Sequence, residues 1–348
     1  MIADKKGCMG ENIMEKERFL MNPKNRPDDR KNLSPQQALV LKMQADNSAA
    51  FDTGAGTYDE LRAAYRRERE MWNIGGPQMY ETKEFTVPYK ESMIHARLLR
   101  PADNMYLPAL FFIHGGGMTV GDNDTHSHMQ RKLAAYSGCA VIGIEYTLSP
   151  EAQYPQPVYE CAEVVRHVVD SADEYGIDTG RIGFSGDSGG ANLAVGTLLY
   201  LRDNGFPMDT VKGAVLYYGG YGLIDGGSYR MHGGSWDGMS EADLMYYQKM
   251  YIGEQDVKDC PYYCIYSRDL SYGMPPCFLA AAELDPLADD NRLFRDVLTN
   301  LGVPCEYHEY GGALHAFAQY SNVMDDAEDS LRRGAHFFAR YCGMQGVE

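Results

Sequence analysis

The sequence has no long hydrophobic run. None of its 348 residues lies in a stretch that approaches the roughly 18 consecutive apolar residues of a membrane-spanning helix. Residues 1–25 are charged and rich in methionine, and they lack the apolar stretch followed by small residues that marks a secretory signal. We therefore expect neither a membrane anchor nor export, and a cytoplasmic location.

Basic residues are also scarce. Lys and Arg number 32 against 49 Asp and Glu, which gives a net charge of −17. Such a charge repels phosphates, so we expect no nucleic acid and no membrane surface as a partner. The eight cysteines are scattered, and a chain of this size needs no disulfide staples, so free thiols in a reducing compartment are expected.

What the sequence does contain is the composition of a folded protein, with 44% hydrophobic and 23% charged residues. From residue 85 onward, short apolar runs alternate with amphipathic helical segments. The expected strands are 85–87, 96–99, 109–113, 140–146, 181–184, 211–218, 276–282 and 305–310. Apolar strands separated by helices predict an α/β fold, with a mostly parallel central sheet and helices on both faces.

Three segments lie outside this alternation. Residues 1–33 are polar and are expected to form a mobile N-terminal segment. Residues 34–75 contain two predicted helices, one capped by Ser34 and one capped by Thr57. Residues 220–260 are rich in Gly and Tyr, contain one short predicted helix, and are expected to form an insertion above the sheet.

The expected strand at 181–184 leads into the sequence GDSGG at 186–190. This matches G-x-S-x-G, in which a serine occupies a strained turn between a strand and a helix and projects its hydroxyl outward. Gly186 and Gly190 must approach each other closely there, so a Cβ at either would collide. The same residues surround the nucleophile of trypsin-like proteases, but those are all-β proteins in which the catalytic His precedes the Ser.

Three glycines follow the expected strand at 109–113, in the sequence HGGG at 114–117. Backbone N–H groups turned into a cavity there would stabilise negative charge on the oxygen of a tetrahedral intermediate. We assign this oxyanion hole to the N–H groups of Gly116, Gly117 and Gly189. His114 is expected to hold the loop in place.

Asp285 and His315 each follow a later strand. An Asp can accept a hydrogen bond from an imidazole, which then acts as a general base on a serine hydroxyl. The carboxyl ends of parallel strands meet at one edge of a sheet, so both side chains can reach Ser188. The chain order Ser188, Asp285, His315 is the order of α/β-hydrolases.

Two other clusters resemble metal sites. Asp122, Asp124, His126 and His128 alternate along the chain, but they lie at an expected helix start where Asp124 would act as the cap. The two cysteines of CPYYC at 260–264 have no second Cys or His pair at zinc-finger spacing. We expect neither a metal nor a cofactor.

These segments together resemble the hormone-sensitive-lipase-like branch of the α/β-hydrolases, in particular the bacterial acetyl esterases. The resemblance extends from about residue 61 to the C-terminal helix. It is carried by HGGG at 114–117, GDNDTH at 121–126, YTLSPE at 146–151, RIGFSGDS at 181–188, DPL at 285–287 and LHAF at 314–317, with WN at 72–73 and WDG at 236–238. One departure is that the residue after the serine, commonly Ala in that family, is Gly189.

The resemblance implies that Ser188 is the nucleophile, Asp285 the acid and His315 the base of a serine carboxylesterase. Such enzymes hydrolyse esters of short, acetyl-like acyl chains without a cofactor. An amidase or peptidase would use the same triad, and a catalytically silent binding protein can share the fold. The expected partner is a small-molecule ester, and the chain is expected to be a monomer or homodimer.

The resemblance also implies a helical cap, built from residues 34–75 and from the insertion at about 220–260. The cap would cover a catalytic domain that spans residues 76–348. The candidates for lining the substrate pocket are Trp72, Trp236 and Tyr218.

Overall fold

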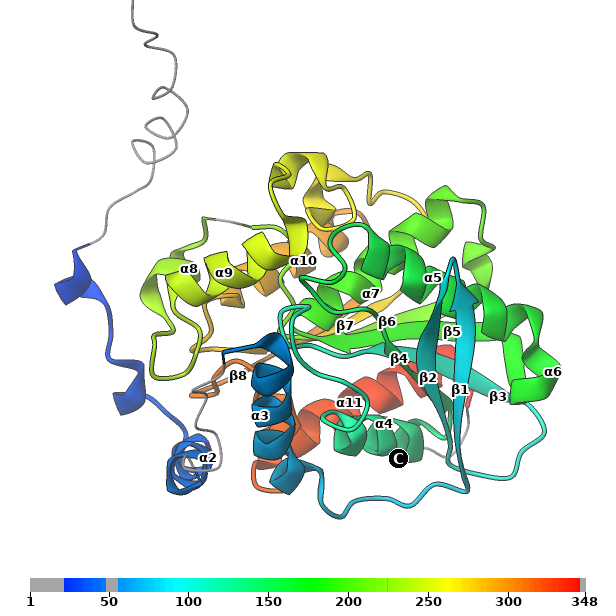
Figure 1. Ribbon diagram of the computed structural model, residues 1–348, viewed down its shortest axis with the longest axis horizontal. Helices are drawn as coiled ribbons and strands as arrows, with labels where there is room; N and C mark the ends of the chain where they lie inside the picture. The colour runs from blue at the N-terminus through cyan, green and yellow to red at the C-terminus, as the bar shows by residue number, and fades with distance from the viewer. Residues whose placement is uncertain (1–21, 48–55, 224, 345–348) are drawn as a thin grey trace, which may run out of the picture.

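Eight strands form one sheet in the order β1-β2-β4-β3-β5-β6-β7-β8 (Figure 1). The structure is a computed structural model that describes residues 22–47, 56–223 and 225–344. The strands are β1 Glu81–Tyr89, β2 Ser92–Arg100, β3 Leu107–Ile113, β4 Ala140–Glu145, β5 Ile177–Asp187, β6 Val211–Tyr217, β7 Cys277–Ala282 and β8 Cys305–Tyr310. Strand β2 runs antiparallel to β1 and β4, and every other neighbouring pair is parallel. The predicted fold class is confirmed.

Helices cover both faces of the sheet. Helices α5 and α7 pack together on one face, and α4 and α11 pack together on the other (Figure 1). The helices are α2 Pro35–Asp46, α3 Tyr58–Glu70, α4 Ser127–Ser137, α5 Gln156–Asp170, α6 Ala172–Tyr175, α7 Gly189–Asp203, α8 Gly227–Met231, α9 Glu241–Ile252, α10 Ala288–Asn300 and α11 Asp325–Tyr341. Short 3-10 helices are Pro23–Asn25, Asp29–Lys31, Met71–Asn73, Met208–Thr210, Val257–Asp259, Ile265–Ser267 and Phe317–Tyr320.

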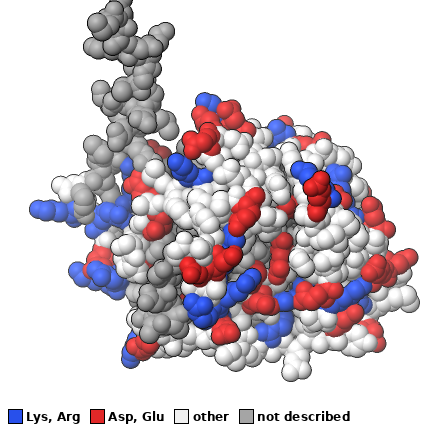
Figure 2. All heavy atoms as spheres, viewed as in Figure 1, with Lys and Arg blue, Asp and Glu red and all other residues white. Residues whose placement is uncertain are grey.

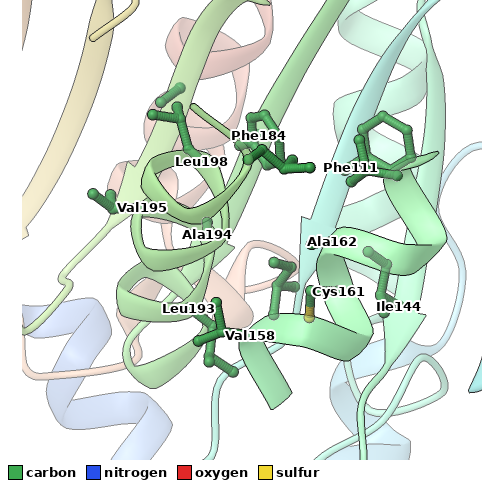
Figure 3. Close-up of a cluster of buried hydrophobic side chains, with 14 of the residues drawn as sticks. Phe111, Ile144, Val158, Cys161, Ala162, Phe184, Leu193, Ala194, Val195 and Leu198 are labelled. Atoms are coloured by element: carbon green, nitrogen blue, oxygen red, sulfur yellow. The ribbon is translucent and has the colours of Figure 1, made fainter. Parts of the chain in front are cut away.

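The hydrophobic core lies between the sheet and these helices. Figure 3 shows apolar side chains of α5 and α7, among them Cys161, Ala194 and Leu198, beside Phe111 and Phe184 of the central strands. Phe111 and Phe184 are fully buried. Among the described residues, no helix is both long and apolar enough to cross a bilayer. On the face seen in Figure 2, acidic and basic side chains are interspersed.

Strand ends differ from the sequence prediction where polar residues continue the backbone pairing. Strand β5 begins at Ile177 instead of residue 181, and the β1–β2 hairpin is longer than the two short apolar runs that predict it. An apolar run marks only the buried part of a strand, whereas hydrogen bonding to a neighbour extends the strand into exposed positions.

The predicted cap of α4 by Asp124 is wrong, because His126 occupies that position and Asp124 instead pairs with Arg97 at 2.7 Å.

The two helices of residues 34–75 begin where their caps predict. The Ser34 side chain accepts a hydrogen bond from the N–H of Gln37, and Thr57 forms a reciprocal capping box with Glu60. Arg62 then holds α3 against the sheet domain. Its guanidinium donates to the carbonyls of Thr119 and Ser149, and it forms a two-pronged ion pair with Glu151 at 2.9 and 2.6 Å.

The segment before α2 contacts the insertion that carries α8 and α9. Residues 1–21 of the expected mobile segment lie outside the described residues. In its described part, the buried carboxylate of Asp29 accepts hydrogen bonds from the His232 ring at 2.9 Å and from the Gly233 N–H at 3.1 Å. Residues near position 29 are thereby joined to the chain some 200 residues later (Figure 1).

Truncation of Phe184 tests the importance of the core. We expect Phe184→Ala to lower the free energy of unfolding by about 3–5 kcal/mol, because a fully buried ring is replaced by a cavity. Denaturant unfolding followed by circular dichroism measures the change. The control is Met105→Ala, whose side chain is 80% exposed and which should change stability by no more than about 0.5 kcal/mol. Equal effects at the two positions would contradict the described packing.

Candidate active site

Ser188 occupies a strained turn between β5 and α7. Its backbone angles are φ 54° and ψ −124°, a conformation that non-glycine residues rarely adopt. A methyl group at Gly186 would lie 2.4 Å from the carbonyl oxygen of Gly190, and one at Gly190 would lie 2.1 Å from the carbonyl oxygen of Ile113. The predicted need for glycine on both sides of the serine is therefore confirmed.

The structure brings the side chains of Ser188, His315 and Asp285 into one hydrogen-bonded line. The Nε2 atom of His315 lies 2.7 Å from Ser188 Oγ, and its Nδ1 atom lies 2.7 Å from Asp285 Oδ2. Asp285 is fully buried, and its other oxygen accepts a hydrogen bond from the Leu287 N–H. The edge of the Tyr218 ring packs against the imidazole, with 5.0 Å between ring centres. Packing and hydrogen bonds thus fix the orientation of both His315 and Asp285.

The Asp285 carboxylate also sets the charge preference of His315. Burial disfavours the positively charged imidazolium and would lower its pKa. The charge of Asp285 and its hydrogen bond outweigh burial, so the pKa of His315 lies above its ordinary value. A proton taken from Ser188 would therefore be held well at this imidazole.

The glycine loop after β3 lies beside Ser188. Gly116 and Gly117 have φ values of 107° and 58°, and a methyl group at Gly116 would lie 2.2 Å from the carbonyl oxygen of Val120. In the described part of the chain, the N–H groups of both glycines donate to no protein acceptor. Gly189 is the first residue of α7, where helical N–H groups have no partner within the helix. Three main-chain donors are thus left available around one cavity that also exposes Ser188.

A buried carboxylate joins the glycine loop to the serine turn. Asp187 accepts a hydrogen bond from the Gly115 N–H and another from Gln319, both at 2.8 Å, and it lies 3.3 Å from His126 Nε2. Burial opposes its negative charge, but His126 and these hydrogen bonds lower the pKa of Asp187 to about 2. Neither Asp187 nor Gln319 was predicted from the sequence to have a role in the site. The available signal was an acidic residue at the end of a buried strand.

His114, at the start of the glycine loop, also contacts it. Burial, with the nearby His126, lowers the pKa of His114 to about 4, so its ring is neutral near neutral pH. The ring stacks on Tyr146 with 4.5 Å between ring centres, and its Nδ1–H donates to the Gly115 carbonyl. These contacts agree with the expectation that His114 positions the loop.

The alternating Asp and His residues at 122–128 bind protein partners. Asp122 pairs with Arg66, and His128 donates a hydrogen bond to the Trp72 carbonyl. Within the described residues, no group of three His, Cys, Asp or Glu side chains is arranged to hold a metal ion. The cysteines at positions 139, 161, 260, 264, 277, 305 and 342 are free.

Ser188 and His315 open onto a cavity of about 480 Å³. Trp236, one of the three predicted lining residues, is in its wall, whereas Trp72 and Tyr218 are not. Both are buried behind the wall: Trp72 packs edge-on against Tyr320, and Tyr218 packs against His315. An aromatic residue near a site in sequence can therefore support the lining without being part of it.

Adjacent glycines provide a matched test of the serine turn. We expect Gly190→Ala to destabilise the fold by about 3 kcal/mol or more, because the new methyl group would overlap backbone atoms of Ile113 and His114. Gly189→Ala should cost less than about 1 kcal/mol, because its nearest contact, at 2.9 Å, is the flexible end of Met118. Denaturant unfolding of both variants measures the difference, and similar losses would contradict the described turn.

Known proteins share this architecture. A protein-family model described as the α/β-hydrolase fold matches residues 110–319, which is more than half of the chain. A hyperthermophilic esterase from the archaeon Pyrobaculum calidifontis is 28% identical with a TM-score of 0.80, over 89% of this chain and 98% of that one. An ester hydrolase from the metagenome of Lake Arreo is 26% identical with a TM-score of 0.82, over 89% and 99%. The thermostable carboxylesterase EstE1, from a metagenomic library, is 26% identical with a TM-score of 0.77, over 84% and 99%. This chain therefore belongs to the α/β-hydrolase fold family, as its resemblance to the hormone-sensitive-lipase-like branch predicts.

Proposed function

We propose that this protein is a serine carboxylesterase that hydrolyses esters of short acyl chains through an acyl-Ser188 intermediate. The observation that carries the proposal is the hydrogen-bonded line from Asp285 through His315 to Ser188, with both distances 2.7 Å, at the wall of a cavity. The similar solved structures, which include an esterase and a carboxylesterase, support an ester as the substrate.

The proposed reaction begins with neutral His315. Its Nε2 accepts the Ser188 proton as Oγ attacks the ester carbonyl, and the carbonyl oxygen becomes an anion. The N–H groups of Gly116, Gly117 and Gly189 stabilise that anion. His315 then gives its proton to the departing alcohol, which leaves an acyl group on Ser188. Water, activated by His315, hydrolyses this acyl-enzyme and restores the free serine.

Asp285 contributes through His315. Its carboxylate accepts the Nδ1–H, which keeps the imidazole in the tautomer whose Nε2 can accept a proton. It also stabilises the imidazolium that forms in each half of the reaction. The Asp187 carboxylate acts indirectly. It accepts the Gly115 N–H and so fixes the backbone that orients the N–H groups of Gly116 and Gly117.

We also propose that residues 34–75 and 220–260 form a cap over the catalytic domain, residues 76–348. Support comes from the cavity wall, to which both segments contribute. The first provides Gln37, Leu41, Gln44, Tyr65 and Arg69, and the second provides Gly220, Gly222, Leu223, Tyr229, Trp236, Asp237, Gly238, Met239, Leu244, Tyr247, Gln248 and Tyr251. The cavity volume of about 480 Å³ is that of an ordinary small-molecule site, and the preference for short acyl chains is proposed from the resemblance to acetyl esterases.

Replacement of the nucleophile tests the activity. We expect Ser188→Ala to lower kcat for 4-nitrophenyl acetate by about 10⁴-fold or more, because the acyl-enzyme cannot form. The unfolding midpoint should stay near that of the wild type. Ser271→Ala, an exposed serine away from the cavity, is the matched control and should keep wild-type turnover. Undiminished hydrolysis by Ser188→Ala would refute the proposal, and so would rates that peak at long acyl chains.

The pH dependence tests the general base. His315 must be neutral to accept a proton, and its pKa is raised, so kcat/KM should fall with decreasing pH and begin to fall above the ordinary pKa of histidine. Asp285→Asn removes the charge that raises this pKa. We expect that variant to be much slower, with its acidic limb shifted to lower pH. A flat acidic profile, or a limb that does not move in Asp285→Asn, would contradict this role.

A further inference from the structure

The part of the cavity wall that helices α2 and α3 provide contains a buried arginine. Arg69, near the C-terminus of α3, is only 8% exposed and yet lines the cavity. We call this region the Arg69 end. The lining residues that define it are Gln37, Leu41, Gln44, Tyr65, Arg69 and Tyr320. A charged group in a buried wall is costly unless it is paired, so its partners indicate what it does there.

The guanidinium of Arg69 is held in a fixed orientation by its neighbours. Its central carbon lies 4.9 Å from the centre of the Tyr65 ring and 5.5 Å from the centre of the Tyr320 ring. Nη1 donates to the Tyr320 hydroxyl at 3.0 Å, and Nε lies 2.8 Å from Glu68 Oε2. Stacking and pairing of this kind pre-organise an arginine for binding, because little side-chain freedom remains to be lost.

The partners of Arg69 leave part of its binding capacity unused. A guanidinium has five N–H donors. Within the described residues, Nη2 has no protein acceptor. The carboxylate of Glu68, which pairs with Nε, also accepts hydrogen bonds from Trp72 Nε1 at 3.0 Å and Gln44 Nε2 at 2.9 Å. Both oxygens of Glu68 are thus engaged, Oε1 by these two donors and Oε2 by Arg69, whereas Nη2 of Arg69 keeps its N–H groups for a ligand in the cavity.

The Arg69 end and the proposed reaction centre belong to the wall of one cavity. Tyr247 of α9 packs on the glycine loop, since a methyl group at Gly117 would lie 2.4 Å from its ring. Burial and the charge of Asp243 raise the pKa of Tyr247, and the positive charge of Arg69 opposes that rise. Gln319, which precedes Tyr320, hydrogen-bonds to Asp187 directly behind the serine turn. Arg69, Gly117 and Ser188 all line this one cavity, so a ligand that fills it contacts each of them.

Two carboxylates, those of Asp237 and Asp290, also stand in the cavity wall. Asp290 of α10 is almost fully buried, and one of its oxygens accepts hydrogen bonds from the N–H groups of Tyr221, Gly222 and Leu223. Its other oxygen accepts from the Tyr266 hydroxyl at 2.6 Å. Burial raises the pKa of Asp290 to about 6, so it is charged near neutral pH. A negatively charged substituent would be repelled here and attracted at Arg69.

We propose that Arg69 is a specificity-determining residue for esters that carry a carboxylate, and that it binds this carboxylate while Ser188 attacks the ester carbonyl. The substrate class is then the half-ester of a dicarboxylic acid or an acylated hydroxy acid. This inference rests on the proposed esterase function. Asp237 and Asp290 in the same wall disfavour an anionic group beside them, so such a substrate would place its carboxylate at Arg69.

Two matched ester pairs test the inference, one for each side of the scissile bond. For the acyl side, mono-4-nitrophenyl glutarate is compared with its neutral analogue 4-nitrophenyl 4-carbamoylbutanoate. For the alcohol side, 4-acetoxybenzoate is compared with 4-acetoxybenzamide. The measured quantity is kcat/KM for the anionic ester divided by kcat/KM for the neutral one. This ratio cancels any general loss of activity in a variant.

We expect Arg69→Gln to lower this ratio about tenfold or more in at least one pair, as the loss of a charge-assisted hydrogen bond predicts. Arg69→Lys should retain part of the preference. Arg67→Gln, which removes the same charge from an exposed position on the same helix, should keep the wild-type ratio. Glu68→Gln should increase the ratio, because it removes the competing carboxylate. A ratio that Arg69→Gln leaves unchanged in both pairs overturns the inference.

A binding measurement separates this inference from the proposed function. Titration calorimetry of the Ser188→Ala protein with 4-acetoxybenzoate reports binding without turnover. Binding that weakens about tenfold or more when Arg69→Gln is added supports the carboxylate site, even if the wild type hydrolyses no ester. Hydrolysis of the neutral esters with no role for Arg69 in either assay overturns the inference and leaves the proposed esterase function intact.

Discussion

The buried carboxylate of Asp187 is the contact on which the rest of the site depends. It accepts hydrogen bonds from the glycine loop after β3 and from Gln319 beyond β8, and it stands one residue before Ser188. Parallel strands bring their ends together, but they do not fix the loops that follow them. One fixed negative charge, with His126 beside it, joins these separate loops into a single rigid surface. The proposed oxyanion donors and the proposed nucleophile thereby keep their relative positions.

Much of this architecture could be predicted from the sequence, because its signals are local. The apolar runs marked the parallel strands, and Gly186 and Gly190 marked a turn in which a methyl group has no space. The chain order of Ser188, Asp285 and His315 placed all three on loops that a parallel sheet brings together. Each of these inferences needs only a few neighbouring residues and a general rule of chain geometry.

Other features depend on contacts between residues distant in sequence, and these could not be predicted. Asp124 has the residue type of a helix cap, yet its charge is taken by Arg97 on a neighbouring strand. Trp72 is a large aromatic close to the site, yet it packs against Tyr320 behind the cavity wall. The buried position of Arg69 likewise follows from how α3 lies over the sheet. A residue type indicates what a side chain can do, whereas its partners decide what it does.

The attachment of α3 by Arg62 has a consequence for how a ligand enters. One guanidinium fixes this helix to the carbonyls of Thr119 and Ser149 and to Glu151, close to the glycine loop. The part of the cavity wall that α3 provides is thus held in a fixed position. A ligand that enters the cavity therefore meets a wall on this side whose place relative to the glycine loop Arg62 determines.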